Sequence, residues 1–124
     1  MDATEPRWRD HYKKYSYIAD ELPDLFSKSF PIESDKIGLF GHSLGGHGVL
    51  VVGLRNPEKF KSLSALAPCC NTSEADEFQQ EMLKPYLGRD KSKWLQYDAS
   101  HLVKSYRGEQ KTILIDQVGS RHFL

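Results

Sequence analysis

The spacing of hydrophobic residues in the first quarter of the chain predicts a helix over residues 15–30. Its apolar positions follow each other at i, i+4, i+7 and i+8, the spacing of one helix face. They are Ile18, Leu22, Leu25 and Phe26, and charged residues occupy the other faces. Pro23 lies inside this pattern, so we expect it to kink the helix or to mark its true start. Pro31 is expected to end it.

The rest of the chain alternates between short apolar runs and helical patterns. We expect strands at 36–40, 60–67 and 112–116, an apolar helix at 46–54, and a polar surface excursion at 71–90 that is helical over 73–83. Residues 92–97 and 100–106 predict short helical turns. This order is typical of an α/β protein with about three parallel strands. The strands are nearly continuous apolar runs, which indicates a sheet covered by helices on both faces.

Composition favours one soluble domain over residues 1–124. The 124 residues include 17 Lys plus Arg and 17 Asp plus Glu, a formal net charge of +0. Nucleic acids and anionic membrane surfaces need a concentrated basic face, so we expect neither as a partner. The longest apolar stretch, 49–52, is far shorter than the roughly 20 residues of a membrane span.

Two further observations favour the cytoplasm. The polar start at 1–6 lacks the apolar core of a secretory signal. Cys69 and Cys70 are sequence neighbours, which rarely reach relaxed disulfide geometry, so we expect two reduced, buried thiols. The sequence shows no His, Cys, Asp and Glu spacing typical of a metal site.

One motif in the sequence predicts a catalytic residue. The residues Gly41-His42-Ser43-Leu44-Gly45 match G-x-S-x-G, the turn that presents a nucleophilic serine between a strand and a helix. We expect Gly41 and Gly45 to be required because side chains there would collide in the cramped turn. The Leu44 N–H would then donate to an oxyanion formed on Ser43. The alternative interpretation is a glycine-rich turn with an incidental serine; the preceding strand and the following small-residue helix favour the nucleophile.

A nucleophilic serine needs a histidine base and a carboxylate that orients it, in the order Ser, acid, His in this fold. His11, His42, His47 and His101 precede the expected acid position after the third strand, and His122 lies two residues from the C-terminus. For His42 and His47 we expect local hydrogen bonding or packing.

The sequence resembles the S-formylglutathione hydrolase (esterase D) family along almost its whole length. The likeness lies in 39–48, Asn56-Pro57, 64–68, 86–88, Lys93-Trp94, 97–103 and 113–117. The resemblance implies a cytosolic thioesterase and carboxylesterase that hydrolyses S-formylglutathione to glutathione and formate. It implies Ser43 as nucleophile, the Leu44 amide as one oxyanion donor, and no cofactor.

The resemblance also reveals departures. The family chain is more than twice as long, so the fold here would lack the first strands, the second oxyanion loop and the histidine segment. Arg121 stands where the family has its acid, and Asp116 matches a strand residue instead. We therefore expect no appreciable esterase activity from the chain alone. An inactive remnant is the alternative function; a lipase-like esterase is weaker because 71–90 is too polar for an apolar lid. The strand at 36–40 would present an unpaired edge, which favours poor solubility or self-association.

Overall fold

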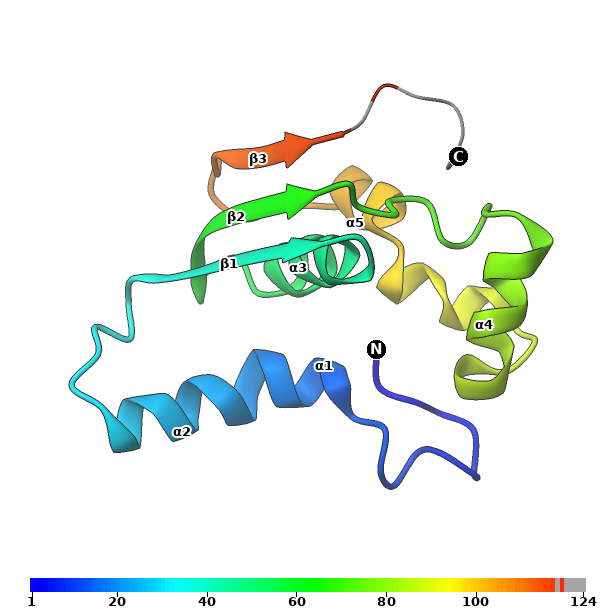
Figure 1. Cartoon of the computed structure of the whole chain (residues 1–124), viewed down its shortest axis with the longest axis horizontal. Coiled ribbons are helices and arrows are strands. Elements are labelled where there is room, and N and C mark those ends of the chain that lie inside the picture. Colours follow the sequence, from blue (N-terminus) through cyan, green and yellow to red (C-terminus); the bar gives the residue numbers. More distant parts are fainter. Residues whose placement is uncertain (118, 120–124) are drawn as a thin grey trace.

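The computed structural model describes residues 1–117 and 119, which form a parallel sheet with helices beside it (Figure 1). In chain order its elements are α1 (Lys14–Ser16), the π-helical η1 (Tyr17–Glu21), α2 (Leu22–Ser29), β1 (Ile37–His42), α3 (Leu44–Arg55), β2 (Phe60–Leu66), α4 (Glu77–Leu87), the 3-10 turns η2 (Lys91–Lys93) and η3 (Leu95–Tyr97), α5 (Ala99–Lys104) and β3 (Ile113–Asp116). The three predicted parallel strands and the α/β class are confirmed.

The sheet has the order β1-β2-β3, and both strand pairs are parallel. Its register aligns Leu39, Leu63 and Ile113 across the strands, and these residues belong to a core cluster with Val49 and Val52 of α3. The prediction that helices cover both faces is wrong for the part of the chain described. The alternate row aligns Phe40, Ser64 and Leu114, and there Phe40 is 84% exposed and Leu114 57%. Because α3 packs on one side only, the other side stays open.

Close contact between α3 and β2 holds the core together. Gly53 of α3 lies directly against the side chain of Leu63, and any Cβ atom there would overlap it. A second cluster joins Val51 of α3 to Leu87, Trp94 and Tyr97. The Trp94 indole N–H donates to the Gly88 carbonyl (3.0 Å), which anchors the end of α4 to the 3-10 turns. Helix α3 is therefore fixed between the sheet and the later helices, and so is the turn at residues 41–46 that leads into it, called the elbow below.

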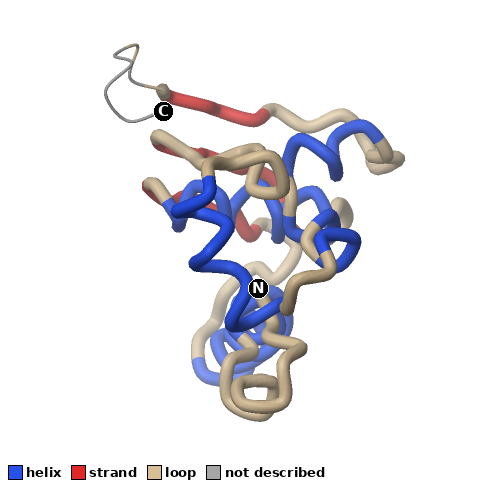
Figure 2. Tube along the Cα trace, turned by 90° about the vertical axis from the view of Figure 1, so that its right-hand side faces the viewer, coloured by secondary structure: helices blue, strands red, loops and turns tan. Residues whose placement is uncertain are grey.

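The first helical segment lies on the β1 side of the sheet in both views (Figures 1 and 2), and its predicted apolar stripe is not its buried face. Ala19 is fully buried against α3 and β2, whereas Leu25 is 56% and Phe26 43% exposed. The π-helical turn η1, which holds Ala19, interrupts the 3.6-residue period on which the prediction rested.

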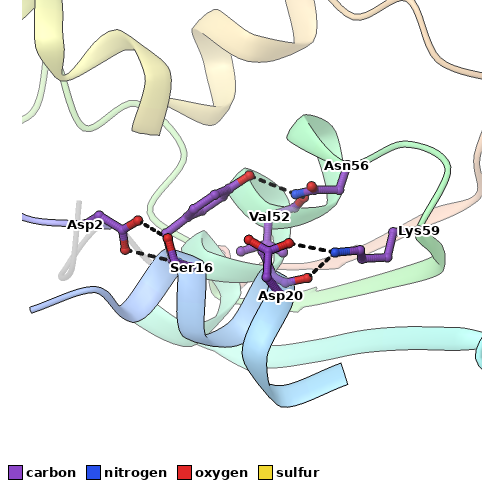
Figure 3. Close-up of polar contacts among 8 residues, drawn as sticks. Asp2, Ser16, Asp20, Val52, Asn56 and Lys59 are labelled. Carbon is purple, nitrogen blue, oxygen red and sulfur yellow. Dashed lines mark hydrogen bonds and ion pairs between the residues drawn. The ribbon is translucent and has the colours of Figure 1, made fainter. Parts of the chain in front are cut away.

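Pro23 explains why a lysine side chain, and not a helix N–H group, binds the carbonyl of Ala19. It has no N–H, so it cannot donate to the carbonyl of Ala19 four residues earlier. The Lys59 ammonium donates to that carbonyl instead (2.6 Å) and pairs with the Asp20 carboxylate (2.7 Å), as Figure 3 shows. The segment therefore continues as a helix through residue 29, with Pro23 at the second position of α2.

The 71–90 segment also differs from the prediction. Its helix begins at Glu77 and ends at Leu87, not at residues 73 and 83. Asp76 starts it by accepting from the Gln79 N–H (2.8 Å), while Thr72 and Ser73 are buried and not part of a surface excursion. No helix in the described residues is both long and apolar enough to cross a bilayer.

Candidate active site

Ser43 lies at a sharp corner between β1 and α3. Its backbone has φ 54° and ψ −117°, in the region that residues with a Cβ atom rarely adopt, and α3 begins at the next residue. The Ser43 N–H donates to the Leu66 carbonyl at the end of β2 (2.8 Å), and the His47 N–H donates to the Ser43 carbonyl (3.0 Å). The strand and the helix are both longer than predicted and meet at this residue. The corner is thus bonded both to the neighbouring strand and to its own helix.

The glycines around Ser43 differ in whether their surroundings leave room for a side chain. A Cβ atom on Gly41 would stand 2.5 Å from the Gly45 carbonyl oxygen, so Gly41 is required, in agreement with the prediction. For Gly45 the prediction is wrong, because a Cβ atom there would meet nothing within 4 Å. Gly46 is also closely packed: a Cβ atom there would lie 3.0 Å from the Leu66 carbonyl oxygen and 3.2 Å from the Pro68 Cβ atom, so its neighbours would have to shift slightly.

Leu44 is the first residue of α3, where backbone N–H groups have no acceptor within the helix. Its side chain is exposed, and the helix N-terminus carries partial positive charge. This N–H therefore has the chemistry of a donor to an anionic oxygen held at Ser43. That role remains a prediction.

The histidines near the corner are not placed as bases. His47 is partly buried, and its Nε2 lies 2.7 Å from the Tyr97 carbonyl oxygen, so that nitrogen must carry a proton and donate it. Burial lowers the pKa of His47. His42 is exposed at the end of β1. Within residues 1–117 and 119, no hydrogen bond links the Ser43 hydroxyl to a histidine.

The carboxyl ends of β2 and β3 complete the surroundings of the corner. Asp116 ends β3, and its carbonyl accepts from the Ala67 N–H (2.6 Å). Ala67 itself has φ 46°. Arg121 and His122, which the sequence places at and beyond the expected acid position, lie outside the described residues.

A buried carboxylate near α3 was not singled out from the sequence. Asp98 is fully buried and accepts from the backbone N–H of Ser73 (2.8 Å) and of His101 (2.9 Å). Burial raises the pKa of Asp98, but the hydrogen bonds that its carboxylate accepts lower the pKa by more. The net pKa is therefore below its usual value. The sequence signal was an Asp directly before a short helix, the pattern of an N-cap. Asp98 thus ties the 71–76 loop to α5.

The two cysteines are free and partly buried. Burial raises the pKa of the Cys70 thiol, which leaves it a poor nucleophile at neutral pH. Among the described residues no group of three or more His, Cys, Asp or Glu side chains gathers as metal ligands would.

Comparison with known proteins places the chain in a family. The chain is 48% identical to a bovine S-formylglutathione hydrolase over all 124 residues and 40% identical to one from Paracoccus denitrificans over 126, and spans 44% of the length of each. An S-formylglutathione hydrolase structure from Agrobacterium tumefaciens superposes with a TM-score of 0.90 at 44% identity, covering 100% of this chain and 44% of that one. A Staphylococcus aureus structure at 22% identity, with a TM-score of 0.66, shows the shared fold.

A model of the Esterase family, described as "Putative esterase", matches residues 1–124. The family resemblance found in the sequence is confirmed: this chain, which spans less than half the length of its curated relatives, belongs to the Esterase family.

Proposed function

We propose that Ser43 is the nucleophile of a serine thioesterase and carboxylesterase site whose substrate is S-formylglutathione. The observation that carries this is the left-handed corner at Ser43, which places a serine at the junction of a parallel strand and a helix N-terminus. The names of the relatives supply the substrate.

The reaction follows from these groups. The Ser43 hydroxyl oxygen would attack the formyl carbon while a base takes its proton. The Leu44 N–H would donate to the oxyanion, and glutathione would leave as its thiol after reprotonation. Water would then hydrolyse the formyl ester, releasing formate and regenerating the hydroxyl. No step requires a cofactor.

The chain by itself is proposed to be a poor catalyst. His47 is engaged by the Tyr97 carbonyl, so it cannot act as the base without breaking a partly buried hydrogen bond. Arg121, at the family's acid position, cannot orient an imidazole as a carboxylate does. An inactive relative of the enzyme is therefore the second candidate for this polypeptide as a molecule.

Two chimeras separate these candidates. In the first, residues 1–117 replace the matching segment of the bovine relative, which then supplies the acid and the histidine. In the second chimera, residues 1–124 replace the matching segment, so that Arg121 is included. We expect S-formylglutathione hydrolysis from the first chimera and none from the second, with recovery in the second after Arg121→Asp.

Ser43→Ala in the first chimera is the matched control and is expected to abolish turnover and labelling by a fluorophosphonate probe. A folded first chimera without Ser43-dependent turnover would refute the proposed nucleophile. For the isolated chain we expect hydrolysis of a p-nitrophenyl ester no faster than that of its Ser43→Ala variant.

We further propose that the site works in the cytoplasm and that copies of the chain associate through β1. The two free cysteines support a reducing compartment. In the described residues β1 pairs with β2 alone, and its residues include no lysine or proline that would discourage further pairing. Among the side chains that the structure describes, Phe40 on this strand is the most exposed large hydrophobic one.

A further inference from the structure

Two residues other than glycine have positive φ in the part of the chain that the structure describes, and each directly follows one of two neighbouring strands. Ser43 (φ 54°) follows β1, and Ala67 (φ 46°) follows β2. A residue with a Cβ atom in this region costs about 1–2 kcal/mol. Such backbone strain persists only where the surroundings enforce it. The corner at Ser43 belongs to the proposed site, whereas the corner at Ala67 has no role there so far.

Main-chain hydrogen bonds connect the two corners. The Ser43 N–H donates to the carbonyl of Leu66, the residue before Ala67 (2.8 Å). The Ala67 N–H donates to the carbonyl of Asp116 at the end of β3 (2.6 Å). Each bond extends the strand pairing one residue beyond a strand end. Ser43 is thus tied to β2, and the same end of β2 is tied to β3.

The Ala67 corner also lies against the first turn of α3. The Leu66 carbonyl oxygen and the Pro68 Cβ atom are 3.0 Å and 3.2 Å from the place that a Cβ atom on Gly46 would take. The residues on both sides of Ala67 therefore contact the elbow, one through a hydrogen bond to Ser43 and the other through packing at Gly46. A different φ at Ala67 would move one of these contacts relative to the other.

We propose that Ala67 is a positioning residue for Ser43. Its left-handed corner, fixed to β3 by the Asp116 carbonyl, sets the Leu66 carbonyl and the Pro68 ring that together hold the elbow in its strained conformation. The inference rests on the proposed function only in taking Ser43 as the nucleophile; the backbone coupling itself concerns residues of the described chain.

Amide hydrogen exchange and backbone NMR on the full chain test this coupling. Glycine adopts positive φ freely, so Ala67→Gly is expected to keep the Ser43 amide protected and its intraresidue HN–Hα signature of positive φ. Valine is β-branched and resists that region, so Ala67→Val is expected to lower the protection of the Ser43 amide about tenfold more than that of α3 amides. The Ser43 left-handed signature should weaken at the same time.

The matched control is Val52→Ala, which weakens the core at the far end of α3. A substitution that only destabilises the whole fold lowers the protection of all globally exchanging amides by one common factor. Val52→Ala is expected to give this uniform loss. The proposal is overturned if Ala67→Val gives the same uniform loss, or if Ala67→Gly disturbs Ser43 as much as Ala67→Val does.

Should Ala67→Val not fold, Pro68→Gly provides the decisive measurement. It removes the Cβ atom that packs at Gly46, and we expect a selective loss of protection at Ser43, whereas an unchanged Ser43 amide contradicts the proposal. These readouts need no catalysis. An inactive chimera with an intact Ser43–Ala67 coupling would therefore refute the proposed function alone.

Discussion

The carbonyl oxygen of Gly45 stands 2.5 Å from the position that a Cβ atom on Gly41 would occupy, so the turn closes over Gly41 and leaves Gly45 open. We therefore expect Gly41→Ala to lower the free energy of unfolding by about 1–3 kcal/mol, through backbone overlap, and Gly46→Ala to lower it by less, because its neighbours need shift only slightly. Gly45→Ala should be neutral or raise it by up to about 1 kcal/mol, because alanine favours the helix.

Urea denaturation of the three variants measures these differences. Gly45→Ala is the matched control, since it makes the same chemical change within the same turn. Equal losses for all three variants would contradict the assignment of Gly41 as the required glycine.

His47 should make stability depend on pH. Its pKa is lowered by burial in the folded chain, while the unfolded chain titrates near the usual value of about 6.5. As pH falls below about 6.5 the unfolded state binds a proton that the folded state resists, so the free energy of unfolding should decrease. Above that pH the neutral form predominates in both states, and the contribution is constant.

The measurement is urea unfolding at pH 7.5 and pH 5.5 for the parent chain and for His47→Gln. Glutamine retains an N–H donor for the Tyr97 carbonyl but does not titrate. The parent is expected to lose more stability than the variant between the two pH values, and parallel losses would exclude His47 as the cause.

Lys59 replaces a hydrogen bond that Pro23 cannot make. Ala19 is fully buried, and its carbonyl accepts from the Lys59 ammonium. We expect Lys59→Met to cost about 1–3 kcal/mol in thermal or urea unfolding, and Lys59→Arg to cost less because it keeps a donor. Asp20→Asn removes only the exposed ion pair and is expected to cost less than about 1 kcal/mol. If Asp20→Asn matched Lys59→Met, the ion pair and not the carbonyl would be the important contact.

The open edge of β1 should drive association. Light scattering of the parent chain is expected to show an average mass that rises with protein concentration. Phe40→Lys adds a charge to this strand and should reduce that rise. Lys61→Glu changes an exposed charge on β2 and serves as the control, with little expected effect. A monomer at all concentrations for both the parent and Phe40→Lys would refute association through this strand.

The corner at Ser43 was predictable because G-x-S-x-G between a strand and a helix encodes a local conformation. The strands were predictable to within two residues because each is an apolar run that ends at a glycine, a proline or polar residues. The buried face of the first helix was not predictable, because its register depends on a π-helical turn, on Pro23 and on Lys59, which lies 40 residues after Ala19. The close packing at Gly46 depends on the Leu66 carbonyl and Pro68, which only the folded chain brings to α3.

The one-sided packing of the sheet has a consequence for sequence variation. Along β2, Leu63 and Ala65 point to α3 and are fully buried, whereas Ser62 and Ser64 alternate with them on the open side. Tolerance to substitution in this strand should rise and fall with every second position. Polar replacements would be accepted at the serines and rejected at their neighbours, so two adjacent residues experience opposite selection.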